Sequence, residues 1–167
     1  MTVFLESCGE ISLINYIDLS DDQKSKILAM RNHPEIKKWM YTQEDITPES
    51  HLAFIEHLKN DRTKLYLLVL FKGQTIGTIN FKEIDRDKRA AEFALFSNPF
   101  SPLPGAGRIL EEAAIRYGTD SLGLRTLTLE VFTDNRQVIN LHKKYGFFTV
   151  GSKLVNNREV LCMRKEI

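Results

Sequence analysis

Apolar positions recur at two spacings along the chain, one typical of β-strands and one typical of amphipathic helices. Seven segments have strand character, either as alternating patterns or as short continuous apolar runs. Glycine and asparagine turns join the second to the third and the sixth to the seventh into hairpins, at Lys72-Gly73 and at Asn156-Asn157. The predicted strands are Ile11–Ile17, Leu65–Phe71, Gln74–Ile84, Ala90–Phe96, Thr126–Phe132 and a closing hairpin of Phe147–Val155 with Glu159–Met163.

Helical spacing fills the stretches between these strands, and the expected start and stop residues flank it. Ser20 and Gln23 have the spacing of a capping box, and the helix that they open ends before His33-Pro34. Thr47-Pro48 is a second start signal, for a helix with one apolar face. The predicted helices run from Ser20 to Met30, briefly through Ile36 and Trp39, from Pro48 through Leu52, Ile55 and Leu58, from about Gly107 to Leu122, and from an Asn135 cap to Tyr145-Gly146. Strands on both sides of the helices predict an α/β fold with a mixed sheet.

Composition narrows the class of protein. The 167 residues, 43% of them apolar, predict one domain spanning residues 1–167. Lys and Arg total 23 against 22 Asp and Glu, which disfavours a nucleic-acid binder that relies on bulk charge. No apolar run is long enough for a membrane span, and the acidic N-terminus does not resemble a signal sequence. Cys8 and Cys162 lack metal-ligand spacing, so we expect reduced thiols, no bound metal and a cytoplasmic protein.

A glycine loop joins the strand ending near Phe96 to the next helix. The segment Pro104-Gly105-Ala106-Gly107-Arg108 places two glycines at the start of that helix. Backbone N–H groups at such a turn form a nest for an anion, and the helix N-terminus adds partial positive charge. The spacing favours a diphosphate, with Arg108 as a pairing cation. It is not a Walker loop, which needs a Gly-Lys-Ser/Thr sequence.

One helix and one strand later comes a segment with Asn135, Leu141, Gly146 and Phe147. Together with the glycine loop, it resembles the acetyl-CoA core of the GCN5-related N-acetyltransferase (GNAT) superfamily. The resemblance implies a mixed seven-stranded sheet with about four helices and a V-shaped split between its central strands. It implies acetyl-CoA as co-substrate. The residues implied to bind it are Leu95, Phe96, Ser97, Pro104, Gly105, Ala106, Gly107, Arg108 and Asn135.

The resemblance also implies direct acetyl transfer to an amine, with no acyl-enzyme. In the superfamily, a bulge in the strand that corresponds to Ala90–Ser97 aims a backbone N–H at the carbonyl oxygen. His142 stands where the family commonly has a tyrosine that protonates the departing thiolate, which makes it the candidate general acid. Asn80 and Glu92, on adjacent strands, are candidates to relay the amine proton through water, and of the two only Glu92 can accept it. A packing role for His142, with water as the acid, stays open.

Two positions depart from the family pattern elsewhere. Pro102 stands where Arg or Gln is usual, so the phosphate site would rely more on backbone N–H groups and on Arg108. Val138 replaces a small alanine.

The N-terminal third carries a more distinctive cluster, Met30-Arg31-Asn32-His33-Pro34, Trp39-Met40-Tyr41 and His51-Leu52. It resembles the branch that acetylates the 4-amino group of a UDP-linked 4-amino-4,6-dideoxy sugar, a step toward pseudaminic acid for flagellin glycosylation. Stacking surface and cations suit a nucleotide sugar. The residues that this resemblance assigns to substrate binding are Arg31, Trp39, Met40, Tyr41, His51 and Phe81.

The sequence leaves other functions open. The acceptor could be a protein N-terminal amine, as in ribosomal-protein acetyltransferases, or another amino sugar. From another class, the chain could be a non-catalytic acetyl-CoA-binding module, since two family side chains are replaced. We expect no nucleic-acid or membrane partner, and either a monomer or a homodimer.

Overall fold

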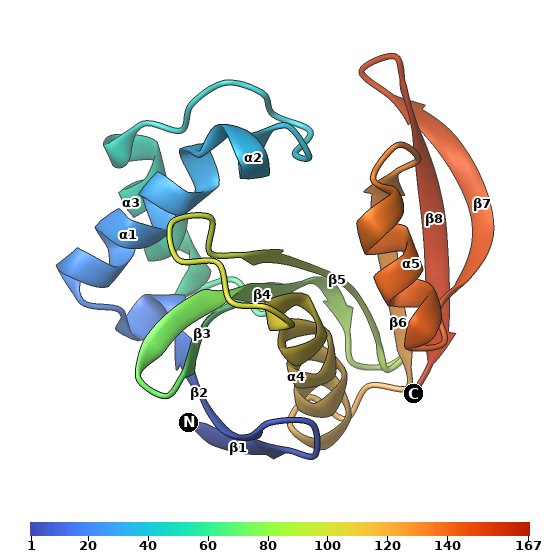
Figure 1. Cartoon of the computed structure of the whole chain (residues 1–167), viewed down its shortest axis with the longest axis horizontal. Coiled ribbons are helices and arrows are strands. Elements are labelled where there is room, and N and C mark those ends of the chain that lie inside the picture. The colour runs from blue at the N-terminus through green and yellow to red at the C-terminus, as the bar shows by residue number, and fades with distance from the viewer.

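The computed structural model describes all 167 residues as a single eight-stranded sheet with helices on both faces (Figure 1). The strands are β1 (Thr2–Leu5), β2 (Gly9–Asn15), β3 (Leu65–Phe71), β4 (Gln74–Asp85), β5 (Ala90–Ser97), β6 (Thr126–Phe132), β7 (Phe148–Val155) and β8 (Arg158–Glu166). The helices are a short 3-10 turn at Tyr16–Asp18, α1 (Asp21–Asn32), α2 (Pro34–Lys37), α3 (Pro48–Leu58), α4 (Ala106–Asp120) and α5 (Arg136–Lys144).

The sheet has the order β1-β2-β3-β4-β5-β6-β8-β7. Every neighbouring pair is antiparallel except β5 and β6, which run parallel through only three residue pairs, Ala90–Glu92 against Thr126–Thr128. Beyond Glu92 the two strands diverge while β5 stays paired with β4 up to Ser97. This confirms the mixed α/β fold and the V-shaped split between central strands.

The strand and helix counts differ from the expectation. There are eight strands rather than seven because residues 2–5 pair with β2, although their mostly exposed positions gave no strand pattern. The first predicted strand also ends early: Asn15 accepts from the Ile17 N–H and opens the 3-10 turn. Five α-helices form rather than four, since α2 is a separate turn that ends at Lys37. Trp39 therefore lies after the helix that was expected to hold it.

Local signals set most helix boundaries. Both hydrogen bonds of the Ser20–Gln23 capping box form, and Thr47 caps α3 ahead of Pro48. Asn135 occupies the N-cap position of α5 but makes no side-chain capping bond, contrary to its predicted role. Leu52, expected on the apolar face of α3, is half exposed, because that face is formed by Ile55 and Leu58.

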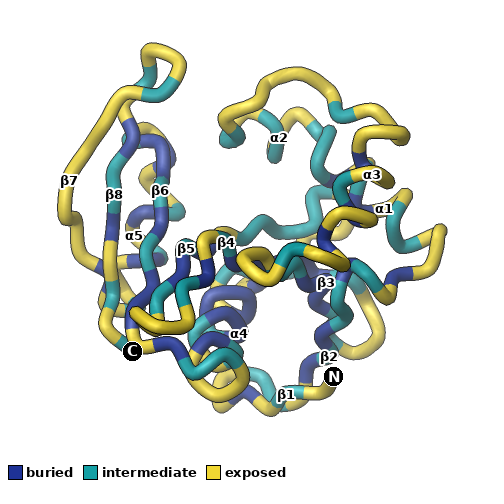
Figure 2. Tube along the Cα trace, turned by 180° about the vertical axis from the view of Figure 1, so that it is seen from behind, coloured by how far each residue is buried: buried dark blue, intermediate teal, exposed yellow.

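Side chains alternate across the sheet and divide the core in two. Leu67 and Val69 of β3 belong to the large cluster around α4, whereas Leu68 joins a smaller one beneath α1 and α3. Residues of β4 alternate likewise, with Ile79 and Phe81 in the large cluster. Between its two register shifts, the even-numbered residues of β4 from Thr78 to Lys82 therefore face the side that α1 and α3 cover, whereas Ile76 and Ile84 lie at the shifts and belong to the large cluster. β7 lies at the far edge of the sheet and is almost wholly exposed (Figure 2).

Candidate active site

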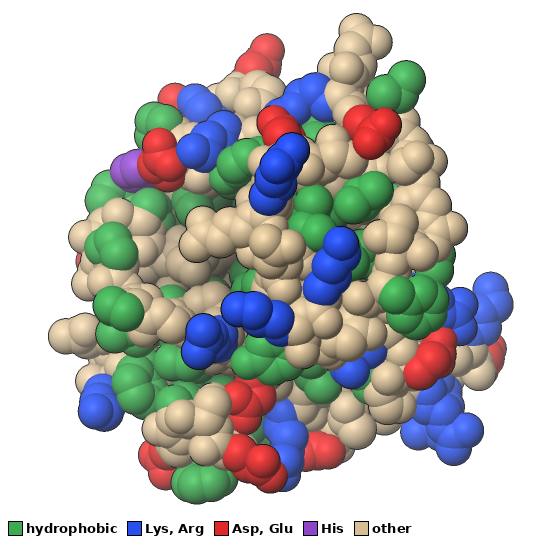
Figure 3. All heavy atoms as spheres, turned by 45° about the vertical axis from the view of Figure 1, so that its right-hand side comes forward, with side chains coloured by type: hydrophobic (Ala, Val, Ile, Leu, Met, Phe, Trp, Pro, Cys, Tyr) green, Lys and Arg blue, Asp and Glu red, His purple; other side chains and the backbone are tan.

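A cavity of about 1620 Å³ occupies the split between β5 and β6. Its walls are β4 and β5 on one side and β6 with α5 on the other. The α4 N-terminus, α1, α3 and the segment that joins α1 to α3 also line it. Figure 3 brings the α5 side of the molecule forward and shows lysine and arginine side chains across the middle of that face. Arg108, Arg136 and Lys144 are the cations that line the cavity near α4 and α5. Of these three, only Arg108 was predicted from the sequence.

The glycine loop forms the start of α4 with free backbone donors. Gly105 is the N-cap in the left-handed region, at φ +84°, and no side chain caps the helix. The Ala106 and Arg108 N–H groups donate to the Leu103 and Gly105 carbonyls, at 3.0 Å each. The Gly105 and Gly107 N–H groups have no partner within the protein. Two unpaired donors at a helix N-terminus suit an anion such as a diphosphate.

The first glycine and the second have different roles. A Cβ at Gly105 would meet no atom within 4 Å, so the left-handed backbone is what requires glycine there. A Cβ at Gly107 would lie 3.2 Å from Leu141 Cδ2 of α5, so this glycine allows α4 and α5 to approach closely. Pro104, Ala106 and Asn135 also line the cavity at this end, and Asn135 is buried.

The edge of β5 faces the opening. From Phe93 onward β5 has lost β6 as a neighbour, so its outward backbone groups are free to pair with an extended ligand. Leu95, Phe96 and Ser97 all line the cavity. The bulge expected within Ala90–Ser97 is not in this strand. The register shift falls on β4, between Lys82 and Asp85, where Glu83 takes a positive φ of 50°.

The cleft face of β4 and β5 carries three polar side chains. Asn80 and Lys82 of β4 and Glu92 of β5 line the cavity, and Lys82 Nζ lies 3.2 Å from Glu92 Oε1. Glu92 keeps 19% of its side chain exposed. A carboxylate held by a lysine at the base of the split can hold water or receive a proton from it.

Phe81 was expected to contact the substrate, and this prediction is wrong. It lies between Asn80 and Lys82, so its side chain points to the opposite face of the sheet. There it is fully buried and stacks on Tyr117 of α4, with ring centroids 6.0 Å apart.

His142 lines the cavity from α5 but is only 5% exposed. Its Nδ1 lies 2.9 Å from Glu111 Oε1 of α4. The ring packs edge-on against Phe93, and Phe147 contacts it at a centroid distance of 5.6 Å. Glu111 is a residue that the sequence analysis missed. Its position among the apolar residues of α4, between Leu110 and Ala113, was the available signal.

Arg31 and His51 both line the cavity from the side of α1 and α3. The Arg31 Nη1 atom is buried without any hydrogen-bond partner, and burial lowers the pKa of this guanidinium. His51 is 7% exposed, with Nε2 2.9 Å from the Lys24 carbonyl oxygen, and burial lowers its pKa as well. His51 therefore joins α3 to α1, while Arg31 has a donor left for a ligand.

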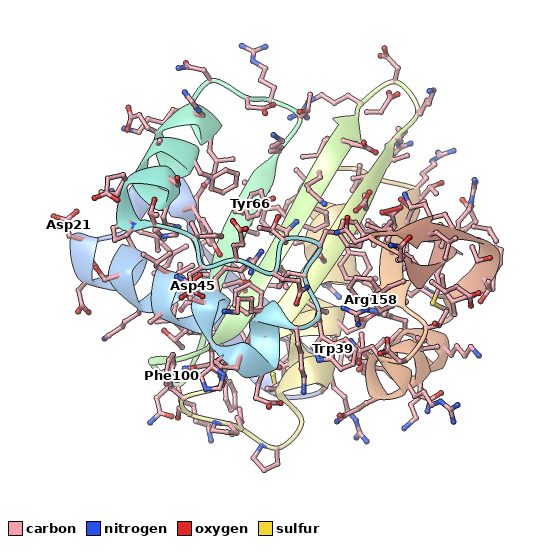
Figure 4. The ribbon with its side chains drawn as sticks, turned by 90° about the horizontal axis from the view of Figure 1, so that it is seen from above. Asp21, Trp39, Asp45, Tyr66, Phe100 and Arg158 are labelled. Carbon is pink, nitrogen blue, oxygen red and sulfur yellow. The ribbon has the colours of Figure 1, made fainter.

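Residues 38–41, named here the bridging loop, cross the cavity to reach its other wall. Arg158 of β8 donates to the Lys38 carbonyl at 3.0 Å, and Asn156 donates to the Tyr41 carbonyl at 2.9 Å. The Tyr41 hydroxyl donates to Glu130 Oε1 at 2.8 Å. Figure 4, seen from above, shows Trp39 and Arg158 between the N-terminal helices and the β6–β8 side. Trp39, Met40 and Tyr41 all line the cavity.

Glu130 is the second residue that the sequence analysis missed. Burial raises its pKa, but hydrogen bonds from Lys153 and from Tyr41 more than offset this and hold the pKa below its ordinary value. Burial raises the pKa of Tyr41, and Glu130 raises it further, so the hydroxyl keeps its proton as a donor. The alternating apolar pattern of β6 places Glu130 outside the core but does not reveal its partners.

No group of three or more His, Cys, Asp or Glu side chains is arranged to hold a metal ion. No helix has the length and apolar character to cross a membrane.

The chain is similar to known acetyltransferases in both sequence and structure. Acetyltransferase PseH of Campylobacter jejuni subsp. jejuni serotype O:23/36 is 36% identical over 137 residues, covering 82% of this chain and 84% of its own length. A crystal structure of C. jejuni N-acetyltransferase PseH in complex with acetyl coenzyme A superposes with a TM-score of 0.76 at 28% identity, over 93% of this chain and 98% of that one.

A spermidine N-acetyltransferase from Vibrio cholerae, in complex with CoA and spermine, has a TM-score of 0.83 at 20% identity, covering 93% of this chain and 95% of its own, which is a likeness of fold alone. The acetyltransferase (GNAT) domain model matches residues 17–148. The chain therefore belongs to the GNAT acetyltransferase family.

Proposed function

We propose that the chain transfers acetyl from acetyl-CoA to the 4-amino group of a UDP-linked 4-amino-4,6-dideoxy sugar, in the pseudaminic acid route to glycosylated flagellin. The observation that carries this proposal is one cavity with two distinct ends. One end offers free backbone donors at Gly105 and Gly107, and the other offers the unpartnered Arg31 guanidinium beside aromatic side chains. The relationship to PseH and the N-terminal cluster of Arg31, Trp39 and Tyr41 support the choice of acceptor.

The coenzyme end fits acetyl-CoA in its chemistry. The Gly105 and Gly107 N–H groups would receive the diphosphate, with Arg108 and Arg136 as nearby cations. The unpaired edge of β5 at Leu95–Ser97 would pair with the pantetheine amides as an added strand. That placement directs the thioester into the split, between β5 and β6.

The acceptor end fits a nucleotide sugar. Trp39, Met40 and Tyr41 form a stacking surface on the bridging loop, and Arg31 supplies a charged donor that has no acceptor in the protein. A buried donor left unpaired costs about 1–3 kcal/mol, and a ligand oxygen in its place recovers that cost. A phosphate or uracil oxygen of the acceptor is suited to this position.

The reaction needs a neutral amine, an oxyanion donor and a proton for the thiolate. Glu92, with water held beside Asn80, would take the ammonium proton. Along Leu95–Ser97 the backbone N–H groups alternate between β4 and the cleft, and one that points into the cleft would donate to the carbonyl oxygen, a contact worth about 3–4 kcal/mol in other enzymes. His142 would protonate the leaving sulfur. No residue needs to carry the acetyl group, so transfer is direct.

The test is a product analysis by mass spectrometry with acetyl-CoA and a panel of amines. The panel contains the UDP-linked 4-amino-4,6-dideoxy sugar, a UDP-linked 3-amino sugar, a peptide with a free N-terminus, and spermidine. We expect acetylation of the first at a kcat/KM at least about 100-fold above the others. Preference for the peptide or spermidine would overturn the acceptor. Coenzyme binding without transfer to any amine would identify a non-catalytic module.

A further inference from the structure

Glu111 is a buried carboxylate that the proposed mechanism has not used. Its exposed fraction is 0%, because it lies in the middle of α4 among core residues. Its Oε1 has a single partner, His142 Nδ1 at 2.9 Å, and its Oε2 has none. A carboxylate moved from water into such a site costs several kcal/mol unless it is neutralised. Its retention at this position therefore needs a compensating proton or positive charge.

The surroundings of His142 leave Glu111 as its only charged contact. The ring packs against Phe93 on β5 and against Phe147 after α5, and both are apolar. Other ionisable groups around α5 lie farther out. They are Arg108 and Glu112 of α4 near Tyr145, Lys143 and Lys144 of α5 itself, and Lys165 of β8 beside Gly146. None of them makes a hydrogen bond to His142.

The number of protons in the pair decides what Nε2 presents to the cavity. With two protons, the pair is an imidazolium on a carboxylate, or a neutral ring on a carboxylic acid, and in both forms Nε2 carries a hydrogen. With one proton, Nδ1–H donates to the carboxylate and Nε2 is a lone pair. Only the two-proton form can donate to a thiolate.

We propose that Glu111 is a positioning residue that holds His142 in the form with hydrogens on both ring nitrogens, so that Nε2–H can act as the acid for coenzyme A. This inference rests on the proposed function of His142. In the step, the C–S bond of the thioester breaks, the electron pair stays on sulfur, and the Nε2 proton moves to it. His142 is left neutral with Nδ1–H on Glu111, and it regains a proton from solvent.

The pair also connects the acid to the coenzyme cradle. Glu111 belongs to the helix whose first residues carry the free Gly105 and Gly107 donors, and His142 belongs to the helix that Gly107 allows to pack closely. The 2.9 Å bond thus fixes the ring relative to the end of the cavity that is suited to the diphosphate.

The test is ¹⁵N NMR of the four histidine rings in the acetyl-CoA-bound protein. The His142 signals would be assigned by their loss in His142→Gln. At neutral pH we expect both nitrogens of His142 to be protonated. In Glu111→Gln, which keeps the shape but removes the charge, the loss of the second proton should move to lower pH, because the carboxylate no longer stabilises the imidazolium. The decline of kcat at high pH should move with it, and kcat at neutral pH should fall about 10- to 100-fold, with the KM for acetyl-CoA within about twofold.

Glu112→Gln is the matched control, because Glu112 is the next residue of α4, is half-buried and makes its one hydrogen bond with the Ser7 N–H, at 3.4 Å. It should leave the His142 signals and kcat unchanged. A neutral His142 with an unprotonated Nε2 in the parent protein would overturn the proposal, even if Glu111→Gln did not fold. So would a Glu111→Gln protein whose His142 titrates as the parent does. The NMR readout needs no acceptor, so it stands whichever amine the enzyme acetylates.

Discussion

The polar side chains that line the cavity differ in whether the protein itself supplies their hydrogen-bond partners. Arg31 is the clearest case, because its Nη1 is buried, has no partner and faces the pocket. His51 is the opposite case, since its Nε2 already bonds to the Lys24 carbonyl and ties α3 to α1. We therefore assign Arg31 to the acceptor and His51 mainly to the scaffold.

Replacing Arg31 with Met tests this assignment, because Met keeps an apolar stem and removes the unpaired donors. We expect the free energy of unfolding of the ligand-free protein to stay the same or rise by about 1 kcal/mol, since an unsatisfied buried group is removed. The KM for the acceptor should rise at least about tenfold, with the KM for acetyl-CoA unchanged. Urea unfolding and steady-state kinetics measure both.

Arg116→Met is the control for Arg31→Met, because Arg116 lies on α4 and pairs only with Asp120, with about half of its side chain exposed. It should change neither quantity. A loss of stability in Arg31→Met without an effect on acceptor KM would assign Arg31 to the scaffold instead.

Glu130 gives a prediction of pH dependence. Its pKa in the folded protein lies below the ordinary 4.5, so its ionised form stabilises the fold. That stabilisation is complete above about pH 4.5 and is lost as the pH falls through the lowered folded value. Glu130→Gln should therefore reduce the free energy of unfolding by about 1 kcal/mol at pH 7 and by less below about pH 4.

Urea unfolding of the parent and of Glu130→Gln at both pH values measures this difference. Glu35→Gln is the control, since Glu35 pairs with Lys38 on the surface of α2. We expect it to have a small effect at both pH values. An equal loss for Glu130→Gln at pH 7 and at low pH would mean that packing, not charge, is what the substitution removes.

The helices and strands of this protein differ in how far neighbouring residues in the sequence determine where they begin and end. Gly105 determines the start of α4 through a backbone conformation that L side chains adopt at a cost of about 1–2 kcal/mol. We expect Gly105→Val to lower the free energy of unfolding by about that amount and to raise the KM for acetyl-CoA severalfold, because its N–H shifts away from the anion. Gly105→Asn should cost less, since Asn tolerates this region better.

Calorimetric titration with coenzyme A measures the effect on coenzyme binding, and urea unfolding measures the effect on stability. Gly151→Val in β7 is the control, because a Cβ there meets no atom within 4 Å and its backbone is not left-handed. It should not change coenzyme binding. Equal affinity in all three variants would remove Gly105 from the cradle.

The same local information explains which elements the sequence predicts. The Ser20–Gln23 box and Thr47-Pro48 are complete within four residues, and both form as expected. By contrast, β1 exists only because it pairs with β2, and no pattern in Thr2–Leu5 records that partner. Phe81 shows the limit for a site residue. An aromatic side chain suited the acceptor, but whether Phe81 faces the cleft or the core depends on how β4 packs against α4.

Pairings between distant residues were likewise outside the reach of the sequence. Glu111 and His142 are separated by 31 residues, and Tyr41 and Glu130 by 89. Each is an ordinary polar residue on its own element, and its role follows only from the tertiary contact. The glycine loop was predictable because its whole geometry lies in four consecutive residues, 105–108.

At the scale of the whole molecule, the two arms of the sheet are joined at both ends of the split, in addition to the packing of α4 against α5. At the closed end, β5 and β6 share three residue pairs. At the open end, the bridging loop reaches β6 through the Tyr41–Glu130 bond and β8 through Arg158, whose guanidinium also lies 3.6 Å from the centroid of the Phe132 ring. Side chains of the bridging loop thus span the wide end of the split. The cavity can therefore enclose an acceptor without a large interface between the arms.

Arg158→Met should weaken that second junction while leaving the first intact. A partly exposed cation–π contact and a charged hydrogen bond together are worth about 1–3 kcal/mol, so we expect faster amide hydrogen exchange in the bridging loop and little change in β5 or β6 near Glu92. The KM for the acceptor should rise more than the KM for acetyl-CoA, because Trp39 and Tyr41 lie on the loop and the glycine cradle does not. Arg164→Met, on the same strand and paired only with Glu166, should leave exchange in the loop unchanged. If Arg158→Met instead accelerated exchange throughout β6 and β8, the contact would be holding the arm together rather than closing the mouth of the cavity.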